Sequence, residues 1–342
     1  MQILVTGATG LLGRHLISSL LERGDTVRAL VLPAENAVWL EERNVAIYRG
    51  DVRKQDTLVE PMRGVDKVFH LAGMMGVWRP MRDYYSVNVE GTRYVCQAAL
   101  GAGVSRLVHV SSWNVYGIGL RQPANEDLPL APFPEPYSLT KAEGEKVVRG
   151  FIDRHHLPAV IIRPDTFFGP GDRLHFGRMA DRLSMGQGIV IGSGRNTLPF
   201  VYVSDVVQGL LLAADHAAAV GQAYNIGNDR PLTQEQFLGA MAQEIGARPP
   251  RVHVPFLPLY ALAFAIEQLA VLGRSQHQPL ITRLGAKLFG TNNLHTIDKA
   301  CRELGYTPKV SIPEGIRIAG SWYRLQRSEL TGVPEIQVGT PA

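Results

Sequence analysis

The sequence predicts an α/β fold in which a doubly wound parallel sheet carries helices on both faces. Short apolar segments alternate with helix-length segments through the first half, and residues 11–23 place apolar side chains at helical spacing. Strands separated by helices pair in parallel, because each connection crosses over the sheet. The second half is rich in Pro and Gly and less regular, which predicts a smaller, mostly helical lobe.

The expected elements follow in chain order from these patterns. In the first half, strands are expected at residues 3–6, 26–32, 45–48, 65–71, 106–111 and 159–163, and helices at 11–23, 84–102 and 136–155. In the second half, helices are expected at 173–185, 204–216, 233–245, 257–272, 296–304 and 313–325. Strands at 200–203 and 223–226 are expected to return to the main sheet, and residues 326–342 to form a loose tail.

The composition excludes several classes of protein. The 342 residues are 45% hydrophobic and 19% charged, which excludes a mainly disordered chain. The net charge is only +4 and no cluster of five or more Lys and Arg occurs, so no nucleic-acid surface is expected. The two cysteines, Cys96 and Cys301, form neither a disulfide framework nor a metal-ligand pattern, and we expect both in the core of a cytoplasmic protein.

The apolar segments are too short to predict a membrane span. The chain begins directly with an apolar run and shows no basic leader, so no secretory signal is expected. The longest uncharged apolar stretch, residues 252–266, contains Pro255 and Pro258 and falls short of the ~20 residues that cross a bilayer. Contact with a membrane surface stays open.

The first strand is followed by a glycine-rich turn, Thr6 to Gly13. Gly7 allows a tight turn, Gly10 lets the backbone approach a diphosphate, and Gly13 lets helix and strand pack closely. The helix that begins at Leu11 and Leu12 offers free amide groups to the anion. This arrangement predicts a Rossmann-type dinucleotide site in residues 1–165, with returning segments near 199–228. Residues 166–198 and 229–325 then form the substrate lobe.

The end of the second strand leaves the choice of cofactor open. The residue that reads the adenosine ribose is expected about 20 residues after the glycines, where the sequence has Leu30 to Pro33. Glu35 and Arg28 are nearby, but neither is at the expected place. The absence of an Arg for a 2′-phosphate favours NAD over NADP, which is not excluded.

Tyr137 and Lys141 lie four residues apart and therefore share one face of the helix expected at 136–155. A neighbouring ammonium favours the phenolate, so Lys141 is expected to lower the pKa of Tyr137 from about 10 and also to hold a nicotinamide ribose. Ser112 follows the strand expected at 106–111, at the sheet edge where ligands bind in such folds. Its hydroxyl is expected to hydrogen-bond the substrate oxygen.

With these motifs, the sequence resembles the extended short-chain dehydrogenase/reductase family up to about Gln326. The matching segments are Thr6–Gly13, Gly50–Val52, His70–Gly73, Asn88–Thr92, Ser111–Gly117, Tyr137–Lys141, Arg163–Pro164 and Tyr202–Asp205. The resemblance implies that Asp51 and Val52 flank the adenine, that Leu71, Ala72 and Gly73 line the cofactor, and that Asn88 braces the active-site backbone. It also implies Ser112, Tyr137 and Lys141 as catalytic residues. Ser111 and Pro164 complete the predicted cofactor set, and no metal is expected.

Departures from the family motifs narrow the reaction. Dehydratases of the family carry an Asp-Glu pair after the catalytic Ser or Thr, where this chain has Trp113 and Asn114, which cannot serve as acid and base. Sugar-nucleotide members bind a diphosphate where this chain has Thr166 and Leu198-Pro199, so a strong charge-assisted contact is lost. Arg195, Arg173 and Arg178 remain as substitutes.

The chain resembles most closely the 3β-hydroxysteroid and sterol-4-carboxylate dehydrogenase branch. The matching segments are Gly192–Asn196, Phe200–Val203, Pro279–Arg283 and Leu304–Pro308. That branch has an apolar helix where residues 252–272 lie here, which suggests packing on the core, a lid over an apolar substrate, or contact with a membrane surface. The predicted substrate residues are Met74, Met75, Trp78, Trp113, Asn114 and Thr166.

The sequence therefore predicts an NAD(P)-dependent oxidoreductase that interconverts a secondary alcohol and a ketone on a hydrophobic, sterol-like or polycyclic substrate. A nucleotide-sugar 4-epimerase is the alternative within the family. A catalytically inactive cofactor sensor is a further alternative, against which the intact set of Ser112, Tyr137 and Lys141 argues. The resemblance also implies a homodimer formed through the helices at 84–102 and 136–155.

Overall fold

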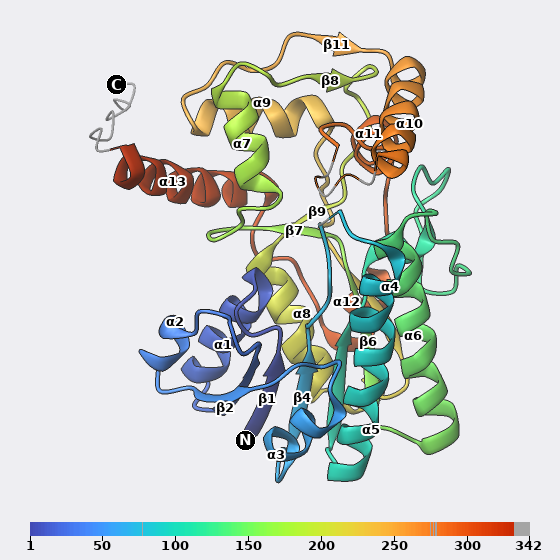
Figure 1. Cartoon of the computed structure of the whole chain (residues 1–342). Helices are drawn as coiled ribbons and strands as arrows, with labels where there is room; N and C mark the ends of the chain where they lie inside the picture. The colour runs from blue at the N-terminus through green and yellow to red at the C-terminus, as the bar shows by residue number, and fades with distance from the viewer. Residues whose placement is uncertain (77, 274, 276, 278, 332–342) are drawn as a thin grey trace.

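A seven-stranded parallel sheet lies at the centre of the structure, which is a computed structural model (Figure 1). It describes residues 1–76, 78–273, 275, 277 and 279–331. The strand order is β10-β6-β5-β4-β1-β2-β3, and every pair is parallel. The strands are β1 (Gln2–Thr6), β2 (Thr26–Val31), β3 (Ala46–Arg49), β4 (Lys67–His70), β5 (Arg106–Val110), β6 (Ala159–Pro164) and β10 (Ala223–Ile226). This order confirms the doubly wound fold.

Both faces of the sheet are covered, which explains its nearly continuous apolar strands. Alternate residues of β1 enter different cores: Ile3 and Val5 pack with the helices on one face, and Leu4 packs with those on the other. The first face carries α1 (Leu11–Glu22), α2 (Val38–Glu41) and α8 (Val203–Asp215). The second carries α3 (Val59–Met62), α5 (Thr92–Ala102) and α6 (Pro136–His155), with a 3₁₀ turn at Gln55–Leu58.

The C-terminal lobe lies beyond the carboxyl ends of the strands (Figure 1). Its helices are α7 (Phe176–Ser184), α9 (Gln234–Glu244), α10 (Phe256–Leu272), α11 (Arg283–Gly290) and α13 (Ile312–Thr331), while α12 (Asp298–Leu304) packs near β10. Two small parallel sheets join β7 (Thr166–Phe168) to β9 (Phe200–Tyr202) and β8 (Val190–Ile191) to β11 (His253–Val254). Short 3₁₀ turns occupy Trp113–Tyr116 and Ala217–Ala219. None of the helices in the described ranges combines the length and apolar composition needed to cross a bilayer.

Four expectations are wrong in detail. The strand at 200–203 does not join the main sheet, because β10 occupies the free edge of β6 and β9 pairs with β7 instead. The tail does not begin at Gln326, since α13 continues to Thr331, while 332–342 lie outside the described residues. The helix α11 was not expected, although Thr282 caps it by accepting a hydrogen bond from the Gly285 amide at 3.1 Å. Cys96 is buried as expected, but Cys301 is exposed.

The helix expected at 84–102 contains a wider turn. It consists of α4 (Met81–Tyr85), a π-helical segment at Ser86–Gly91 and α5, which follow one another without a break. Gly91 packs tightly there, because a Cβ at this position would lie 2.8 Å from Cγ2 of Val52. Such π segments occur frequently at functional sites, and this one carries Asn88.

Buried histidines lie at matching positions of the two central strands. His70 of β4 and His109 of β5 pair in register, and their ring centroids are 5.4 Å apart. His70 Nδ1 lies 2.8 Å from Thr6 Oγ1, and Nε2 lies 3.1 Å from Thr92 Oγ1. The Thr92 hydroxyl donates its proton to the Asn88 carbonyl, so its oxygen accepts from Nε2–H of a neutral His70. Burial, aided by the charge of Lys141, lowers the pKa of His70 to about 3.

This burial predicts an acid-sensitive fold. The pKa of His70 is lower in the folded chain than in the unfolded chain, so the free energy of unfolding falls as the pH drops below about 6.5. His70→Gln should reduce the loss of stability between pH 7 and pH 5 by about 2 kcal/mol, because one group contributes up to ~1.4 kcal/mol per pH unit. Urea unfolding at both pH values measures this difference. The exposed His216→Gln variant is the control, and an unchanged pH dependence in His70→Gln would contradict the prediction.

Candidate active site

The predicted glycine loop lies at the carboxyl end of β1 and begins α1. Gly7 has φ +71°, and a Cβ there would lie 2.8 Å from the Ala72 amide, so the loop packs directly on the segment after β4. A Cβ at Gly13 would lie 2.3 Å from the Gly7 carbonyl. Gly10 caps α1 without a side-chain acceptor, so the amides of Leu11 and Leu12 are available to a ligand. These features fit the diphosphate of a dinucleotide.

The structure places the Glu35 carboxylate at the end of β2, although its position in the sequence did not predict this. Glu35 Oε2 accepts a hydrogen bond from the Leu32 amide at 3.3 Å, which brings this side chain back to the end of the strand. Arg28 turns away and donates to the carbonyls of Pro61 and Arg63 at 3.1 and 2.7 Å. Spacing alone could not place Glu35, because the turn after β2 reverses the chain. A carboxylate here suits the hydroxyls of an adenosine ribose.

Asp51 and Val52 lie at the end of β3, with different environments. Burial pushes the pKa of Asp51 upward, but hydrogen bonds and charge from Arg53 outweigh it and hold the pKa below its usual value. The closest contact of this pair, from Arg53 Nη2 to Asp51 Oδ2, is 2.6 Å. Val52 is buried in the core and contacts Gly91. Asp51 is therefore a charged, fixed residue beside the π segment.

The structure brings Ser112, Tyr137 and Lys141 to the carboxyl edge of the central strands. Ser112 caps the 3₁₀ turn after β5, where its oxygen accepts from the Asn114 amide at 3.3 Å. Glu135 caps α6 by accepting from the amides of Tyr137 and Ser138, at 2.9 and 2.5 Å. This cap starts the helix one turn before Lys141. Two sequence-distant segments thus place the three side chains together.

The pKa of Tyr137 differs from the prediction. Burial raises it to about 12, the Ser112 hydroxyl hydrogen-bonded to the phenol opposes this rise, and the charge of Glu135 adds to it. The expected net lowering of this pKa is wrong for this arrangement, because burial dominates. The Lys141 ammonium instead donates to the Val110 carbonyl at 2.5 Å. Tyr137 is therefore a protonated phenol at neutral pH.

Lys141 is buried, and burial lowers its pKa to about 8 against the opposing charge of Glu145. That carboxylate is fully buried and forms an ion pair with Arg163, whose Nε donates at 3.0 Å. Ser111 also donates to Glu145, at 3.0 Å, so its hydroxyl belongs to this buried network rather than facing an open site. Pro164 lies at the end of β6.

Asn88 joins the site to the segment that follows β4. Its Oδ1 accepts from the Met74 amide at 2.7 Å, and its Nδ2 donates to the Met74 carbonyl and to Thr140 Oγ1 at 3.1 and 3.0 Å. A Cβ at Gly73 would lie 3.3 Å from Asn88 Oδ1 and 3.8 Å from Lys141 Nζ, so Gly73 borders Asn88 and Lys141. The predicted bracing role of Asn88 agrees with this geometry.

The predicted substrate residues fall into two groups. Met74, Met75 and Trp78 are half-buried, and the backbone of Met74 is hydrogen-bonded to Asn88. Trp113 and Asn114 are buried, and the Trp113 indole donates to Thr166 Oγ1 at 3.1 Å. Trp113 forms an apolar cluster with Ile118 and Phe133, on which Leu284 and Leu288 of α11 pack.

Two residues near Trp113, His295 and Asp165, were not predicted from the sequence to belong to the site. His295 Nδ1 lies 2.5 Å from Asp165 Oδ1, and the imidazole contacts the rings of Trp113 and Tyr116 at centroid distances of 5.1 and 5.8 Å. The two residues are 130 positions apart in the chain, and neither belongs to a motif that could have paired them. Through these ring contacts the His295–Asp165 pair packs against Trp113 and Tyr116.

The chain is similar in sequence and in fold to known proteins. The model of the NAD dependent epimerase/dehydratase family matches residues 3–227. The chain is 33% identical over 332 residues to 2-alkyl-3-oxoalkanoate reductase of Stenotrophomonas maltophilia, covering 93% of this chain and 98% of that protein. It is 32% identical over 337 residues to mouse (Mus musculus) sterol-4-alpha-carboxylate 3-dehydrogenase, decarboxylating, covering 95% and 92%. The crystal structure of gox2253 superposes with a TM-score of 0.81 at 31% identity, covering 95% and 98%.

The residues matched by the family model include the glycine loop, Asn88, Ser112, Tyr137 and Lys141. The relatives are named as a reductase and a dehydrogenase, which supports the predicted branch. The chain therefore belongs to the NAD dependent epimerase/dehydratase family, and within that family it is an oxidoreductase.

Proposed function

We propose that the protein interconverts a secondary alcohol and a ketone on a hydrophobic substrate, with NAD as the hydride carrier. The observation that carries this proposal is the placement of Ser112, Tyr137 and Lys141 beside the glycine loop at one sheet edge. NAD, when bound, supplies a nicotinamide carbon that gives or takes the hydride. The hydroxyls of Ser112 and Tyr137 hydrogen-bond the substrate oxygen.

Tyr137 is proposed as the proton donor in ketone reduction. With a pKa of about 12 it carries its proton at neutral pH, so the proton passes from its oxygen to the substrate oxygen as the carbonyl carbon accepts the hydride. The hydride on carbon and the proton on oxygen together convert the ketone into the secondary alcohol. Lys141 is proposed to hold the nicotinamide ribose, since its ammonium lies at the end of β5 and contacts the Val110 carbonyl.

NAD is proposed over NADP because of Glu35. Its carboxylate at the end of β2 accepts hydrogen bonds from ribose hydroxyls and repels a 2′-phosphate. The residues proposed to contact the cofactor are Gly7, Gly10, Leu11, Leu12, Gly13, Asp51, Val52, Leu71, Ala72, Gly73, Asn88, Tyr137, Lys141 and Pro164, while the Ser111 side chain is left in the buried network with Glu145.

The apolar surroundings of Trp113 support a hydrophobic substrate. Trp113, Ile118 and Phe133 form a buried apolar cluster on which α11 packs, and the relatives are named for a 2-alkyl-3-oxoalkanoate and a sterol-4-alpha-carboxylate. A nucleotide-sugar 4-epimerase remains the alternative. It is less well supported because Leu198 and Pro199, both buried and uncharged, stand where such enzymes carry residues that bind a diphosphate.

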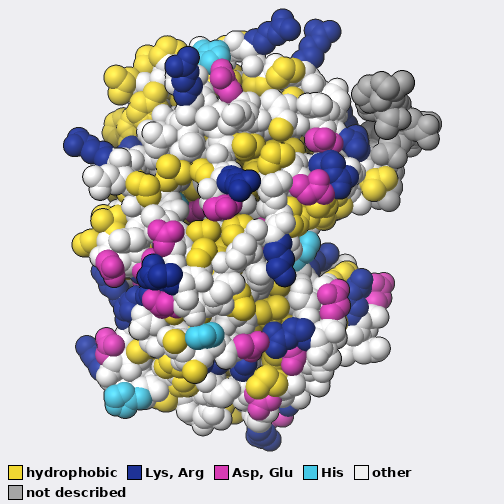
Figure 2. Space-filling model, turned by 180° about the vertical axis from the view of Figure 1, so that it is seen from behind, with side chains coloured by type: hydrophobic (Ala, Val, Ile, Leu, Met, Phe, Trp, Pro, Cys, Tyr) yellow, Lys and Arg dark blue, Asp and Glu magenta, His cyan; other side chains and the backbone are white. Residues whose placement is uncertain are grey.

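The helix α10 suggests where the substrate comes from. Its buried residues, Leu259, Ala263 and Glu267, form one narrow stripe, and Glu267 is paired inward with Arg283 at 2.5 Å. Leu257 and Leu269 are 75% and 68% exposed. Figure 2 shows apolar side chains gathered along the edge of the upper lobe. We propose that this face touches a membrane surface, from which a lipid-soluble substrate is taken.

A groove of about 410 Å³ runs between the π segment, α5 and α6. Arg93 and Arg154 line it together with Glu143, so one copy offers both signs of charge to another. We propose that this face forms a homodimer.

We also propose that the protein is cytoplasmic, which its two free cysteines support.

The central test is the variant Tyr137→Phe. We expect a loss of at least about 100-fold in kcat with a hydrophobic β-keto or hydroxy acid, because proton transfer from the phenol is removed. Affinity for NADH, measured by its fluorescence, should stay within twofold. Tyr94→Phe is the matched control. Full turnover by Tyr137→Phe contradicts the mechanism, tighter binding of NADPH contradicts the choice of NAD, and clear binding of UDP-glucose in calorimetry favours the epimerase.

The membrane contact is tested with Leu269→Asp. Flotation with phosphatidylcholine vesicles should recover the wild type with the vesicles, and Leu269→Asp should lower that recovery severalfold because a charge enters the apolar face. Leu128→Asp, at an exposed leucine in the other lobe, should behave like the wild type. A wild type that stays with the unbound fraction would contradict the proposal.

The dimer is tested by light scattering after size-exclusion chromatography. The wild type should have twice the mass of one 37.5 kDa chain, and Val147→Glu should shift the protein toward the monomer, because it places a charge in the groove. Val59→Glu, at an exposed position outside the groove, is the control. A monomeric wild type at micromolar concentration would refute the proposed interface.

A further inference from the structure

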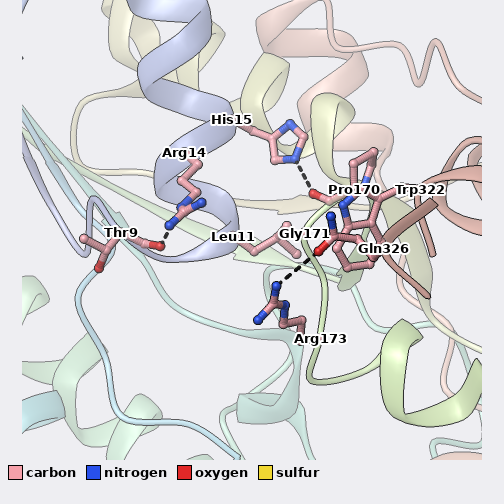
Figure 3. A pocket seen from close by; sticks show the side chains of 9 residues that line it. All are labelled: Thr9, Leu11, Arg14, His15, Pro170, Gly171, Arg173, Trp322 and Gln326. Atoms are coloured by element: carbon pink, nitrogen blue, oxygen red, sulfur yellow. Dashed lines mark hydrogen bonds between the residues drawn. The ribbon is translucent and has the colours of Figure 1, made fainter. Parts of the chain in front are cut away.

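A cavity of about 460 Å³ lies beside the glycine loop and is built from three distant parts of the chain (Figure 3). Thr9, Leu11 and Arg14 come from the loop and α1, Arg173 comes from the segment after β7, and Trp322 and Gln326 come from α13. The C-terminal helix therefore borders the same space as the amides that begin α1.

The cavity is positively charged. Arg14 Nε donates to the Thr9 carbonyl at 3.1 Å, and Arg173 Nη2 donates to Gln326 Oε1 at 3.2 Å. Among the ion pairs of the described ranges, neither arginine has a carboxylate partner. No acidic residue lies in the first turn of α1 either. Two guanidinium groups without a countercharge favour an anion here.

The segment that carries Arg173 is held firmly against α1. His15 Nε2 lies 3.0 Å from the Pro170 carbonyl, and Gly171, at φ +95°, comes so close to Leu11 that a Cβ would lie 3.4 Å from its Cδ1. Asp172 then accepts from the amides of Leu174, His175 and Phe176 at 2.9 to 3.0 Å. Arg173 is thus fixed at its backbone between a docked turn and a capped turn. Figure 3 shows its guanidinium below Leu11.

We propose that Arg173 binds the cofactor diphosphate from the side opposite the α1 amides, and that Gln326 of α13 holds its side chain in place. The inference rests on the proposed function, because it takes the dinucleotide as the anion. A guanidinium presents paired N–H groups that match phosphate oxygens. Cofactor binding and the position of the C-terminal helix are then linked through one side chain.

The test is the NADH affinity of Arg173→Ala, measured by fluorescence titration. We expect a dissociation constant roughly 10- to 100-fold higher than that of the wild type, as for the loss of a charge-assisted hydrogen bond. Adenosine, which has no phosphate, should bind both proteins equally in calorimetry. Arg178→Ala, an exposed arginine on α7 outside the cavity, should leave both affinities unchanged. The NADH dissociation constant of Arg173→Lys should lie between those of Arg173→Ala and the wild type, because lysine keeps the charge but not the paired N–H groups. Such partial rescue would show that the loss in Arg173→Ala does not come from unfolding.

Hydrogen exchange in α13 provides a readout independent of activity. NADH should slow exchange in the wild-type helix but much less in Arg173→Ala and Gln326→Ala. If the wild type fails to bind NADH, the proposed function fails. If Arg173→Ala binds NADH like the wild type, or if inorganic phosphate alone slows exchange in α13 to the same extent as NADH, the diphosphate assignment is wrong while the proposed function stands.

Discussion

One continuous set of hydrogen bonds holds the active site in register. It begins at the Ala72 amide, which donates to Thr6, and passes through His70 and Thr92 to the Asn88 carbonyl. The Asn88 side chain then joins Thr140, which lies beside Lys141 on α6. The set links the glycine loop, the central strand β4 and the catalytic helix. Every hydrogen bond in this set has one donor and one acceptor that its neighbours determine. His70 must therefore be neutral, with Nδ1 as acceptor and Nε2–H as donor, and a change at any member disturbs the others.

The sequence predicts most of this site because local rules determine it. The glycines, the Tyr137–Lys141 spacing and the strand ends follow from turn chemistry, helical period and chain direction, and all are read within a few residues. The fold of the sheet follows for the same reason, since the strands buried on both faces are continuous apolar runs.

What the sequence did not predict depends on contacts between distant residues. Glu35 returns to the end of β2 through a turn, and His295 meets Asp165 across the molecule. The raised pKa of Tyr137 depends on burial, which spacing cannot reveal. The strand β9 pairs with β7, while β10 takes the edge of the main sheet beside β6. Which strand takes that edge depends on contacts along the whole chain.

The π segment at Ser86–Gly91 sets the orientation of Asn88 relative to α5. A π turn holds one residue more than an α turn, so the loss of a single codon there would restore an ordinary helix. Relative to α5, Asn88 would then rotate by about 100° and leave Met74, while Val95, Cys96 and Ala99 would keep their place in the core. The length of this segment therefore decides whether Asn88 keeps its hydrogen bonds to Met74.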